Sequence, residues 1–290
     1  MIKHSLKKLP KSTVEITVEI PKDIIETSYK EAFDKLRENL ELEGFRKGKV
    51  PKEIAEKNLQ KDSVYQELIR TLLPKLYDDV VKKESLKPVV SPKVELVKAQ
   101  EGQDWQIKIS VAERPTVTIG DYKKIIQKVK QEKKKDTIWV PGKDKTEPSD
   151  EQKAKHNQEL LNAILNELLK NSKVEVSDLI LEEELNGRLT RLVDDVQKLG
   201  MTMDTYLKSK NLTIDVLREQ YRSEIEGIHQ MEFLLNEIAE LEKIQVENVE
   251  LEKLFSAIKD EKEKVMARQN AYFYAALLRK QKTLDFLLGL

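Results

Sequence analysis

Apolar residues near the start of the chain follow first the period of a strand and then the period of helices. Over residues 14–20, Val and Ile alternate with Glu and Thr, which predicts a half-buried strand. Apolar residues then recur every three or four positions over 25–40 and over 64–81, which predicts two amphipathic helices. Pro74 lies inside the second of these stretches. Because proline removes a backbone hydrogen bond, a kink or a break is expected there.

Two further strands are predicted after these helices. Residues 89–97 and 105–112 are rich in Val and Ile, and a turn containing glycine separates them. Pro51 can begin a short additional helix between the two longer ones. The order of one strand, three helices and two strands across residues 10–113 indicates a compact α+β domain, with helices against a small antiparallel sheet.

From Ser149 onward the pattern is helical almost throughout. The tetrapeptide that begins at Ser149 has the capping-box pattern of a helix start. The longest apolar stripe runs from about Thr213 to Leu241, a helix of roughly 43 Å at about 1.5 Å per residue. Residues 173–178 and 243–248 resemble each other, each with a β-like pair of Val or Ile before a polar cap. We expect two similar helix-to-helix turns at the base of protruding helical hairpins.

The stretch between these two regions has a different composition. Proline and glycine punctuate it and it contains a run of three lysines, which indicates a partly extended linker. The predicted architecture is elongated. It consists of an α+β N-terminal domain (1–115), a linker (116–148) and an all-α C-terminal domain with protruding helical arms (149–290).

Charge and composition exclude several classes of protein. Lys plus Arg and Asp plus Glu number 52 each, and there are no cysteines, which excludes disulfides, thiolate metal sites and cysteine nucleophiles. Apolar runs are too short to span a membrane and the polar N-terminus does not resemble a secretory signal, so a cytoplasmic protein is expected. The first half carries a modest excess of basic residues, which favours an anionic partner there.

Signals of catalysis are lacking in the sequence. The three histidines, His4, His156 and His229, are far apart and have no partner at ligand spacing, so no metal site is predicted. The usual motifs of serine hydrolases, zinc proteases and dinucleotide-binding enzymes do not occur. Carboxylates lie on helix faces crowded with lysine, which indicates surface ion pairs. We therefore predict no catalytic residues and no cofactor.

The clearest functional signal is the basic loop over residues 44–51, Gly-Phe-Arg-Lys-Gly-Lys-Val-Pro. It fails as a phosphate-binding P-loop, because only three residues separate its glycines and Val50 stands where a Ser or Thr is needed. The glycines permit tight turns, four cations lie within residues 46–52, and Phe45 adds an apolar anchor. This combination suits docking onto a mixed surface of protein and RNA. The alternative is a helix end followed by a solvated turn.

This octapeptide resembles the ribosome-docking signature of the trigger factor family, the bacterial nascent-chain chaperones. The order of strands and helices around it is similar to the N-terminal domain of that family. In the second half, residues 174–178, 199–201, 206–207 and 284–288 are similar to the C-terminal chaperone domain and occur in the expected order. The resemblance covers most of the chain except residues 121–150.

The resemblance implies an ATP-independent chaperone that docks on the large ribosomal subunit, on protein and RNA at the polypeptide exit tunnel. It would hold nascent or unfolded chains through apolar patches in a helical cradle. Neither DNA nor a membrane is implied as a partner, and a homodimer is an alternative state off the ribosome. The residues that the resemblance assigns to ribosome docking are Gly44, Phe45, Arg46, Lys47, Gly48, Lys49 and Pro51.

Client contacts are expected at apolar side chains of the helical half. Methionine is flexible and polarizable, which suits the binding of many different chains. Three consecutive aromatic residues on one helix cannot all face a single core. An ordinary core position is the alternative for each residue. The candidate client-binding residues are Met201, Met203, Tyr206, Met231, Phe233, Phe255, Met266, Tyr272, Phe273 and Tyr274.

The middle of the chain departs from the family pattern. Typical members carry an FKBP-type peptidyl-prolyl isomerase domain between the two halves, and such a domain needs on the order of a hundred residues. Only about 30 residues join Gly120 to the first helix of the C-terminal half. We therefore expect neither the isomerase domain nor its activity. The rival interpretations are a helical scaffold or adaptor for one dedicated partner, an envelope chaperone with a similar cradle, and a cryptic isomerase.

Overall fold

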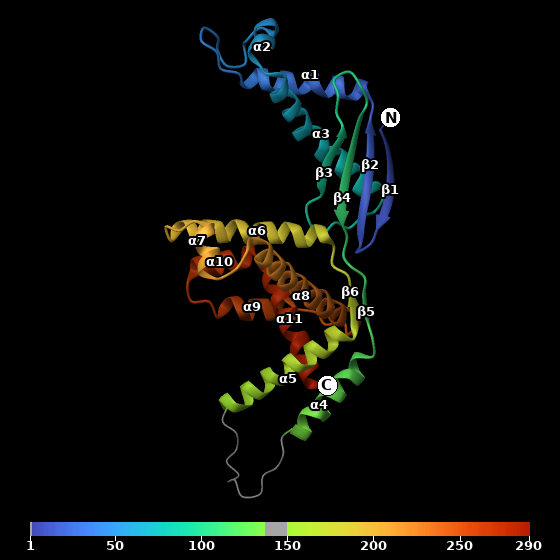
Figure 1. Cartoon of the computed structure of the whole chain (residues 1–290), viewed down its shortest axis with the longest axis vertical. Helices are drawn as coiled ribbons and strands as arrows, with labels where there is room; N and C mark the ends of the chain where they lie inside the picture. Colours follow the sequence, from blue (N-terminus) through green and yellow to red (C-terminus); the bar gives the residue numbers. More distant parts are fainter. Residues whose placement is uncertain (1, 137–149) are drawn as a thin grey trace, which may run out of the picture. The chain divides into compact units, whose positions relative to one another are not determined.

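The structure is a computed structural model that describes residues 2–136 and 150–290 (Figure 1). The chain divides into two compact units. The N-terminal unit comprises Met1–Arg114 and Ser177–Ile180, and the C-terminal unit comprises Pro115–Val176 and Leu181–Leu290.

Three helices and a four-stranded sheet build the N-terminal unit. The sheet is antiparallel, in the order β1-β2-β4-β3. Its elements in chain order are β1 (Lys3–Leu9), β2 (Thr13–Ile20), α1 (Lys22–Asn39), α2 (Lys52–Asn58), α3 (Lys61–Lys83), β3 (Lys93–Lys98) and β4 (Trp105–Ala112).

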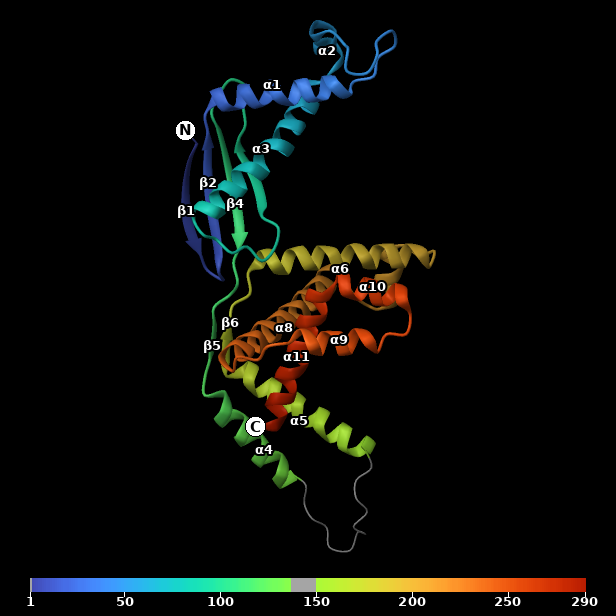
Figure 2. The ribbon, with the colours of Figure 1, turned by 180° about the vertical axis from the view of Figure 1, so that it is seen from behind.

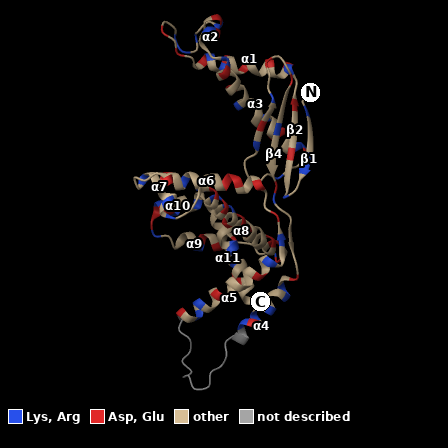
Figure 3. Cartoon of the chain, viewed as in Figure 1, with Lys and Arg blue, Asp and Glu red and all other residues tan. Residues whose placement is uncertain are grey.

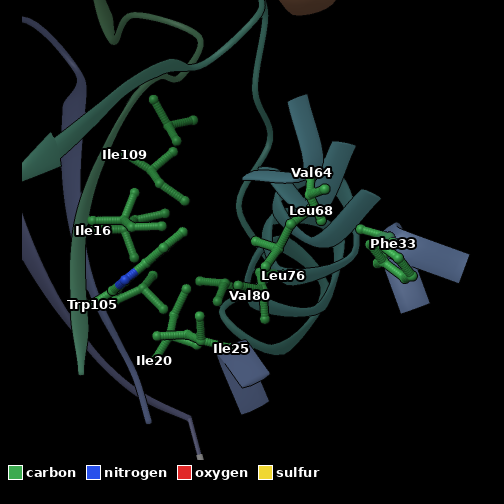
Figure 4. Packing of buried hydrophobic residues seen from close by; sticks show 14 of the residues in the cluster. Ile16, Ile20, Ile25, Phe33, Val64, Leu68, Leu76, Val80, Trp105 and Ile109 are labelled. Atoms are coloured by element: carbon green, nitrogen blue, oxygen red, sulfur yellow. The ribbon is translucent and has the colours of Figure 1, made fainter. Parts of the chain in front are cut away.

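The central strands β2 and β4 provide the sheet side of the core. Ile16 lies opposite Ile109 and Val18 lies opposite Ile107, and all four side chains are at most 1% exposed. Figure 4 shows the sheet residues Ile16 and Ile109 directed toward the side chains of α3. Burial of each such side chain stabilises the fold by about 1.5–3 kcal/mol. The alternating pattern therefore predicted both central strands correctly.

The edge strand β1 was not predicted. It pairs with β2 over its whole length, from Lys3 opposite Glu19 to Leu9 opposite Thr13. Its side chains are exposed or half-buried. An exposed edge strand needs no apolar alternation, so the hydrophobic pattern carries no signal for it, and backbone pairing with β2 decides its conformation.

Helices α1 and α3 pack on the sheet, and α3 crosses one face of it in the reverse view (Figure 2). The buried side chains of α3 include Leu68 and Leu76, which lie on either side of Pro74. The helix continues through Pro74 from Lys61 to Lys83, so the alternative of a break is wrong. Burial of leucines on both sides offsets the cost of about 3 kcal/mol of an interior proline.

An ion cluster around the buried carboxylate of Glu67 joins α1 to α3. The Glu67 carboxylate accepts hydrogen bonds from Arg70 Nε at 2.8 Å and Arg70 Nη2 at 2.9 Å. Lys35 Nζ of α1 lies 3.0 Å from Glu67 Oε1. These hydrogen bonds, from Arg70 first and then Lys35, lower the pKa of Glu67 from 4.5 to about 2. The carboxylate is thus held in its charged form between two helices.

The N-terminal unit is expected to lose stability as the pH falls from about 4.5 to about 2. Because the pKa of Glu67 is lower in the folded chain, its contribution is complete above 4.5 and disappears as the pH approaches the folded value of about 2. Urea midpoints measured at several pH values test this. Glu67→Gln should lower the urea midpoint at neutral pH and make the midpoint depend less on pH in the acid range. Glu31→Gln, at an exposed position on α1, should change neither the midpoint nor its pH dependence. Parallel pH curves for Glu67→Gln and the unaltered protein would count against Glu67.

In the described residues of the C-terminal unit, the chain forms eight helices and a two-stranded ribbon. The ribbon is antiparallel, with Val117 opposite Val174. The elements in chain order are β5 (Val117–Ile119), α4 (Tyr122–Asp136), α5 (Asp150–Lys170), β6 (Ser172–Val174), α6 (Asp178–Lys198), α7 (Met203–Ser209), α8 (Ile214–Leu241), α9 (Asn248–Ser256), α10 (Glu261–Gln269) and α11 (Ala271–Gly289). Ser149, the first residue of the predicted capping box, lies outside the described residues.

Four helices meet in the core of this unit. Ile126 of α4, Ile164 of α5, Leu234 of α8 and Leu287 of α11 are each fully buried in one cluster. The long helix α8 was predicted correctly. Its N-cap is Thr213, whose side chain accepts a hydrogen bond from the amide of Val216.

The structure differs from the linker prediction over residues 117–136. This stretch forms β5 and α4, and both belong to the C-terminal unit. Tyr122 and Val129 are buried together with Ile126, and the Tyr122 hydroxyl donates to the Glu242 carboxylate at the end of α8. The apolar positions of α4 follow helical spacing. Seven lysines lie among them, so the stretch was interpreted as a linker and not as a helix. Residues 137–148 of the predicted linker lie outside the described residues.

Candidate docking loop and exposed apolar helix face

The loop over residues 44–51, called here the docking loop, follows α1 and contains two tight turns. The Phe45 amide donates to the Leu42 carbonyl at 3.0 Å, and the Lys49 amide donates to the Arg46 carbonyl at 2.9 Å. The third residue of each turn is a glycine with positive φ, +86° at Gly44 and +78° at Gly48, as a type II turn requires. The Gly-x-x-x-Gly spacing therefore sets the shape of the loop.

The C-terminal end of the docking loop is held in place. Val50 is only 4% exposed and belongs to the core of the N-terminal unit. Pro51 follows as the N-cap residue of α2, with a φ of −59°. The residues between the first glycine and Val50 are exposed. The loop is thus a projecting segment anchored by one apolar side chain at its end.

The exposed side chains of this loop are one aromatic ring and three cations. Phe45 is 38% exposed. Lys47 Nζ lies 3.6 Å from a Glu41 carboxylate oxygen. Neither Arg46 nor Lys49 has an ion-pair partner among the described residues. Figure 3 shows that positive residues lie on the loop before α2. The geometry offers two unpaired cations beside an apolar contact.

The predicted client-binding residues fall into three groups by exposure. Phe255 is 2% exposed, with its ring 5.6 Å from that of Tyr274 in an edge contact, so it is a core residue of α9 and cannot contact a client from this position. The half-buried group comprises Met201, Met203, Tyr206, Met231, Phe233 and Tyr274. The exposed group comprises Met266, Tyr272 and Phe273.

The first turns of α11 form an exposed apolar face. Tyr272 is 90% exposed and Phe273 is 63% exposed, whereas Tyr274 turns toward Phe255. Leu277, one turn further along, is 52% exposed and extends this face. Leu277 was not predicted as a site residue, although its spacing of four from Phe273 places it on the same helix face. Contiguous exposed apolar patches are a common feature of binding surfaces.

Beside this face lies a groove of about 650 Å³, bounded by α8, α11 and residues 244–246. Neither Leu235 on α8 nor the pair Ala275 and Ala276 on α11 was predicted as a site residue, yet all three line it. The sequence could not place these segments together, because α8 and α11 lie far apart along the chain.

Two kinds of site are not found in the parts of the chain that the structure describes. Within residues 2–136 and 150–290, no group of three or more His, Asp or Glu side chains is arranged to hold a metal ion. In the same residues, no helix combines the length and the apolar character that crossing a lipid bilayer requires.

Comparison with known proteins gives consistent results for both halves. A family model described as "Bacterial trigger factor protein (TF)" matches residues 2–138, and one described as "Bacterial trigger factor protein (TF) C-terminus" matches residues 144–288. The trigger factor of Lactococcus lactis subsp. cremoris strain MG1363 is 32% identical over 125 residues, which are 43% of this chain and 29% of that protein. The trigger factor of Streptococcus pneumoniae strain Hungary19A-6 is 36% identical over 118 residues, 41% of this chain and 28% of that protein.

The matched region thus spans less than a third of the length of these curated relatives. A solved structure is similar over a much larger share. It is described as "Promiscuous Substrate Recognition in Folding and Assembly Activities of the Trigger Factor Chaperone", and the match has a TM-score of 0.65 with 16% sequence identity over 99% of both chains. At this identity the likeness shows a shared fold.

Proposed function

The chain belongs to the trigger factor family, and we propose that it is an ATP-independent chaperone that docks on the ribosome and holds nascent or unfolded polypeptides. The observation that carries this proposal is the exposure of the docking loop, with Phe45 and two unpaired cations projecting from an anchored double turn. A loop that only connected two helices would need neither an exposed aromatic ring nor unpaired positive charge.

The proposed docking partner is the large ribosomal subunit beside the polypeptide exit tunnel. Arg46 and Lys49 suit RNA phosphates and acidic side chains, and arginine in particular pairs with two acceptor oxygens at once. Phe45 can enter an apolar depression on a ribosomal protein, as aromatic anchors do in other interfaces. Because much of the affinity for RNA comes from charge, docking should weaken as the salt concentration rises.

Client holding is proposed for the exposed apolar side chains of the C-terminal unit, first of all Tyr272, Phe273 and Met266. Nascent chains expose apolar side chains before they fold, and these bury area against such a face. Folding of the client removes the same groups from reach, so the equilibrium favours release without nucleotide hydrolysis. The half-buried candidates can contribute only where their side chains reach the surface.

We also propose that the chain lacks prolyl isomerase activity. The two family models leave only residues 139–143 between their matches, whereas a separate isomerase domain needs on the order of a hundred residues. Catalysis of a proline-limited refolding reaction by the purified protein would contradict this part of the proposal.

Two measurements on the purified protein test the main proposal. At a concentration equal to or below that of the unfolded protein, the purified chain should suppress aggregation without ATP. It should do so for several unrelated unfolded proteins. The protein should also co-sediment with ribosomes, more strongly at low than at high salt. Suppression limited to one protein would favour a scaffold or adaptor with one dedicated partner. Failure to bind ribosomes at either salt concentration would exclude the docking role.

A further inference from the structure

The four-stranded sheet of the N-terminal unit has two edge strands of different character. In the order β1-β2-β4-β3, β1 and β3 each have one neighbour among the described strands. The charged residues of β1 are lysines without any acidic residue, so two copies of β1 repel each other, and such charge is a common protection of a sheet edge. β3 is exposed along its whole length, carries both signs of charge and is apolar at three of its six positions. The edge at β3 is therefore the less protected of the two.

Two apolar side chains of β3 lie on the core-facing side of the sheet. Val94 is paired with Ile109 of β4, and Leu96 is paired with Ile107. Directly paired residues share a face of the sheet, and both isoleucines are 1% exposed in the core. Val94 is nonetheless 37% exposed and Leu96 is 45% exposed. The apolar layer of the sheet thus reaches this edge and stays partly open to solvent, where a further strand would cover it.

The backbone of β3 is regular enough to accept such a strand. It keeps an unbroken register with β4 from Lys93 to Leu96, and the register shifts only between Leu96 and Lys98. In an antiparallel sheet, every second residue of an edge strand directs its N–H and C=O groups away from the one neighbouring strand. Within residues 2–136 and 150–290, no strand pairs with these groups of β3. The described chain therefore leaves a strand-pairing edge open.

The charges of β3 favour a second copy of the same strand as the partner. Lys93 and Glu95 flank Val94 on the other face of the sheet, with Lys93 Nζ 3.1 Å from Glu95 Oε1 within one copy. When Val94 lies opposite Val94 in an antiparallel pair, each Lys93 lies opposite Glu95 of the other copy, and such opposite charges stabilise a sheet. A two-fold axis at Glu95 sets two carboxylates opposite each other. An axis at Leu96 sets Val94 opposite Lys98, and an axis midway between neighbours in 93–96 sets an apolar side chain opposite a charged one.

We infer that the β3 edge is a self-association surface, at which two copies of the chain pair their β3 strands antiparallel about a two-fold axis at Val94. The two Val94 side chains then meet on the core-facing side, and two pairs of Lys93 with Glu95 form on the other side. One pair of short strands is a small interface, so the association is reversible and depends on concentration. The surface shares no residue with the docking loop or with the exposed face of α11, and the inference does not rest on the proposed function.

The absence of cysteine from the chain makes the proposed axis directly testable. Val94→Cys places one thiol of each copy on the axis. Directly opposed Cα atoms of an antiparallel pair are about 4.5–5.5 Å apart, and a disulfide joins Cα atoms about 4.4–6.8 Å apart. Mild oxidation of the full chain should therefore give a disulfide-linked dimer. Leu6→Cys is the matched control and should stay monomeric, because Leu6 is also 37% exposed on the core-facing side of an edge strand. Equal cross-linking of the two variants, or none through position 94, would overturn the inference.

Exchange of charge tests the register without oxidation. Glu95→Lys sets a lysine opposite Lys93 of the other copy and should weaken self-association, measured by sedimentation equilibrium of the full chain, by about tenfold. Lys93→Glu sets two carboxylates opposite each other and should weaken it similarly. An equimolar mixture of these two variants restores opposite charges at both positions and should associate as tightly as the unaltered chain. A mixture that stays as weak as the single variants, or an unaltered chain that remains monomeric up to millimolar concentration, would contradict the pairing.

Discussion

Replacing Phe45, Arg46 and Lys47 together by alanine is expected to abolish co-sedimentation with ribosomes and to leave thermal unfolding nearly unchanged. The three side chains project from the double turn and make few contacts within the chain. Their removal therefore costs little folding energy but deletes the apolar anchor and two of the cations that face a partner. Ribosome pelleting at two salt concentrations and a thermal unfolding curve provide the two measurements.

The N-terminal strand offers a closely matched control for this variant. Leu6, Lys7 and Lys8 are likewise an apolar residue followed by two cations, all exposed, with Leu6 at 37% exposure against 38% for Phe45. The triple alanine change there removes the same net charge from the same unit. It should leave ribosome binding intact. Equal loss by the two triple variants would show that overall charge, and not the docking loop, governs binding.

Pro74→Ala is expected to stabilise the N-terminal unit by about 2 kcal/mol. A proline inside a helix costs about 3 kcal/mol, because one backbone hydrogen bond is missing and the ring crowds the preceding turn. Proline also restricts the unfolded chain, and losing that restriction gives back about 0.4–1 kcal/mol. Since Pro74 is exposed within α3, alanine fits without repacking the core.

Trp105 supplies the measurement for this variant, because its ring is 3% exposed in the core of the N-terminal unit. A Trp139→Phe background makes it the sole tryptophan, and urea unfolding followed by its fluorescence gives the free energy. Pro51→Ala is the control. Pro51 stands before α2, where proline suits the backbone, so that change should not stabilise the unit. If Pro74→Ala does not raise the free energy of unfolding, the backbone of α3 has already adjusted to the proline ring.

The elements that the sequence predicted are those whose signal is local. The alternation of residues 14–20 and 105–112 identified β2 and β4, and the long apolar stripe over residues 213–241 identified α8. Propensity, capping and periodicity act over a few neighbouring residues, so one sequence is enough to reveal them. The docking loop belongs to this class, because its glycines fix both turns and its cations are adjacent in the chain.

Other features needed contacts between distant parts of the chain. β1 exists because β2 offers it a backbone partner, and α4 is held by a core to which α5, α8 and α11 contribute. The buried Glu67 carboxylate is held in its charged form by Arg70 of its own helix and by Lys35, which approaches from α1.

The sequence by itself determined the strands β2 and β4, the long helix α8, the turns and charge of the docking loop, and the resemblance to the family. Only the tertiary structure decided that Phe255 is core, that Tyr272 and Phe273 are open to solvent, and that residues 244–246 border a groove with α8 and α11. The physical reason is that burial and cavity shape depend on which surfaces meet in space. The sequence around an aromatic residue on a helix does not show whether its side chain packs against another helix or is exposed to water.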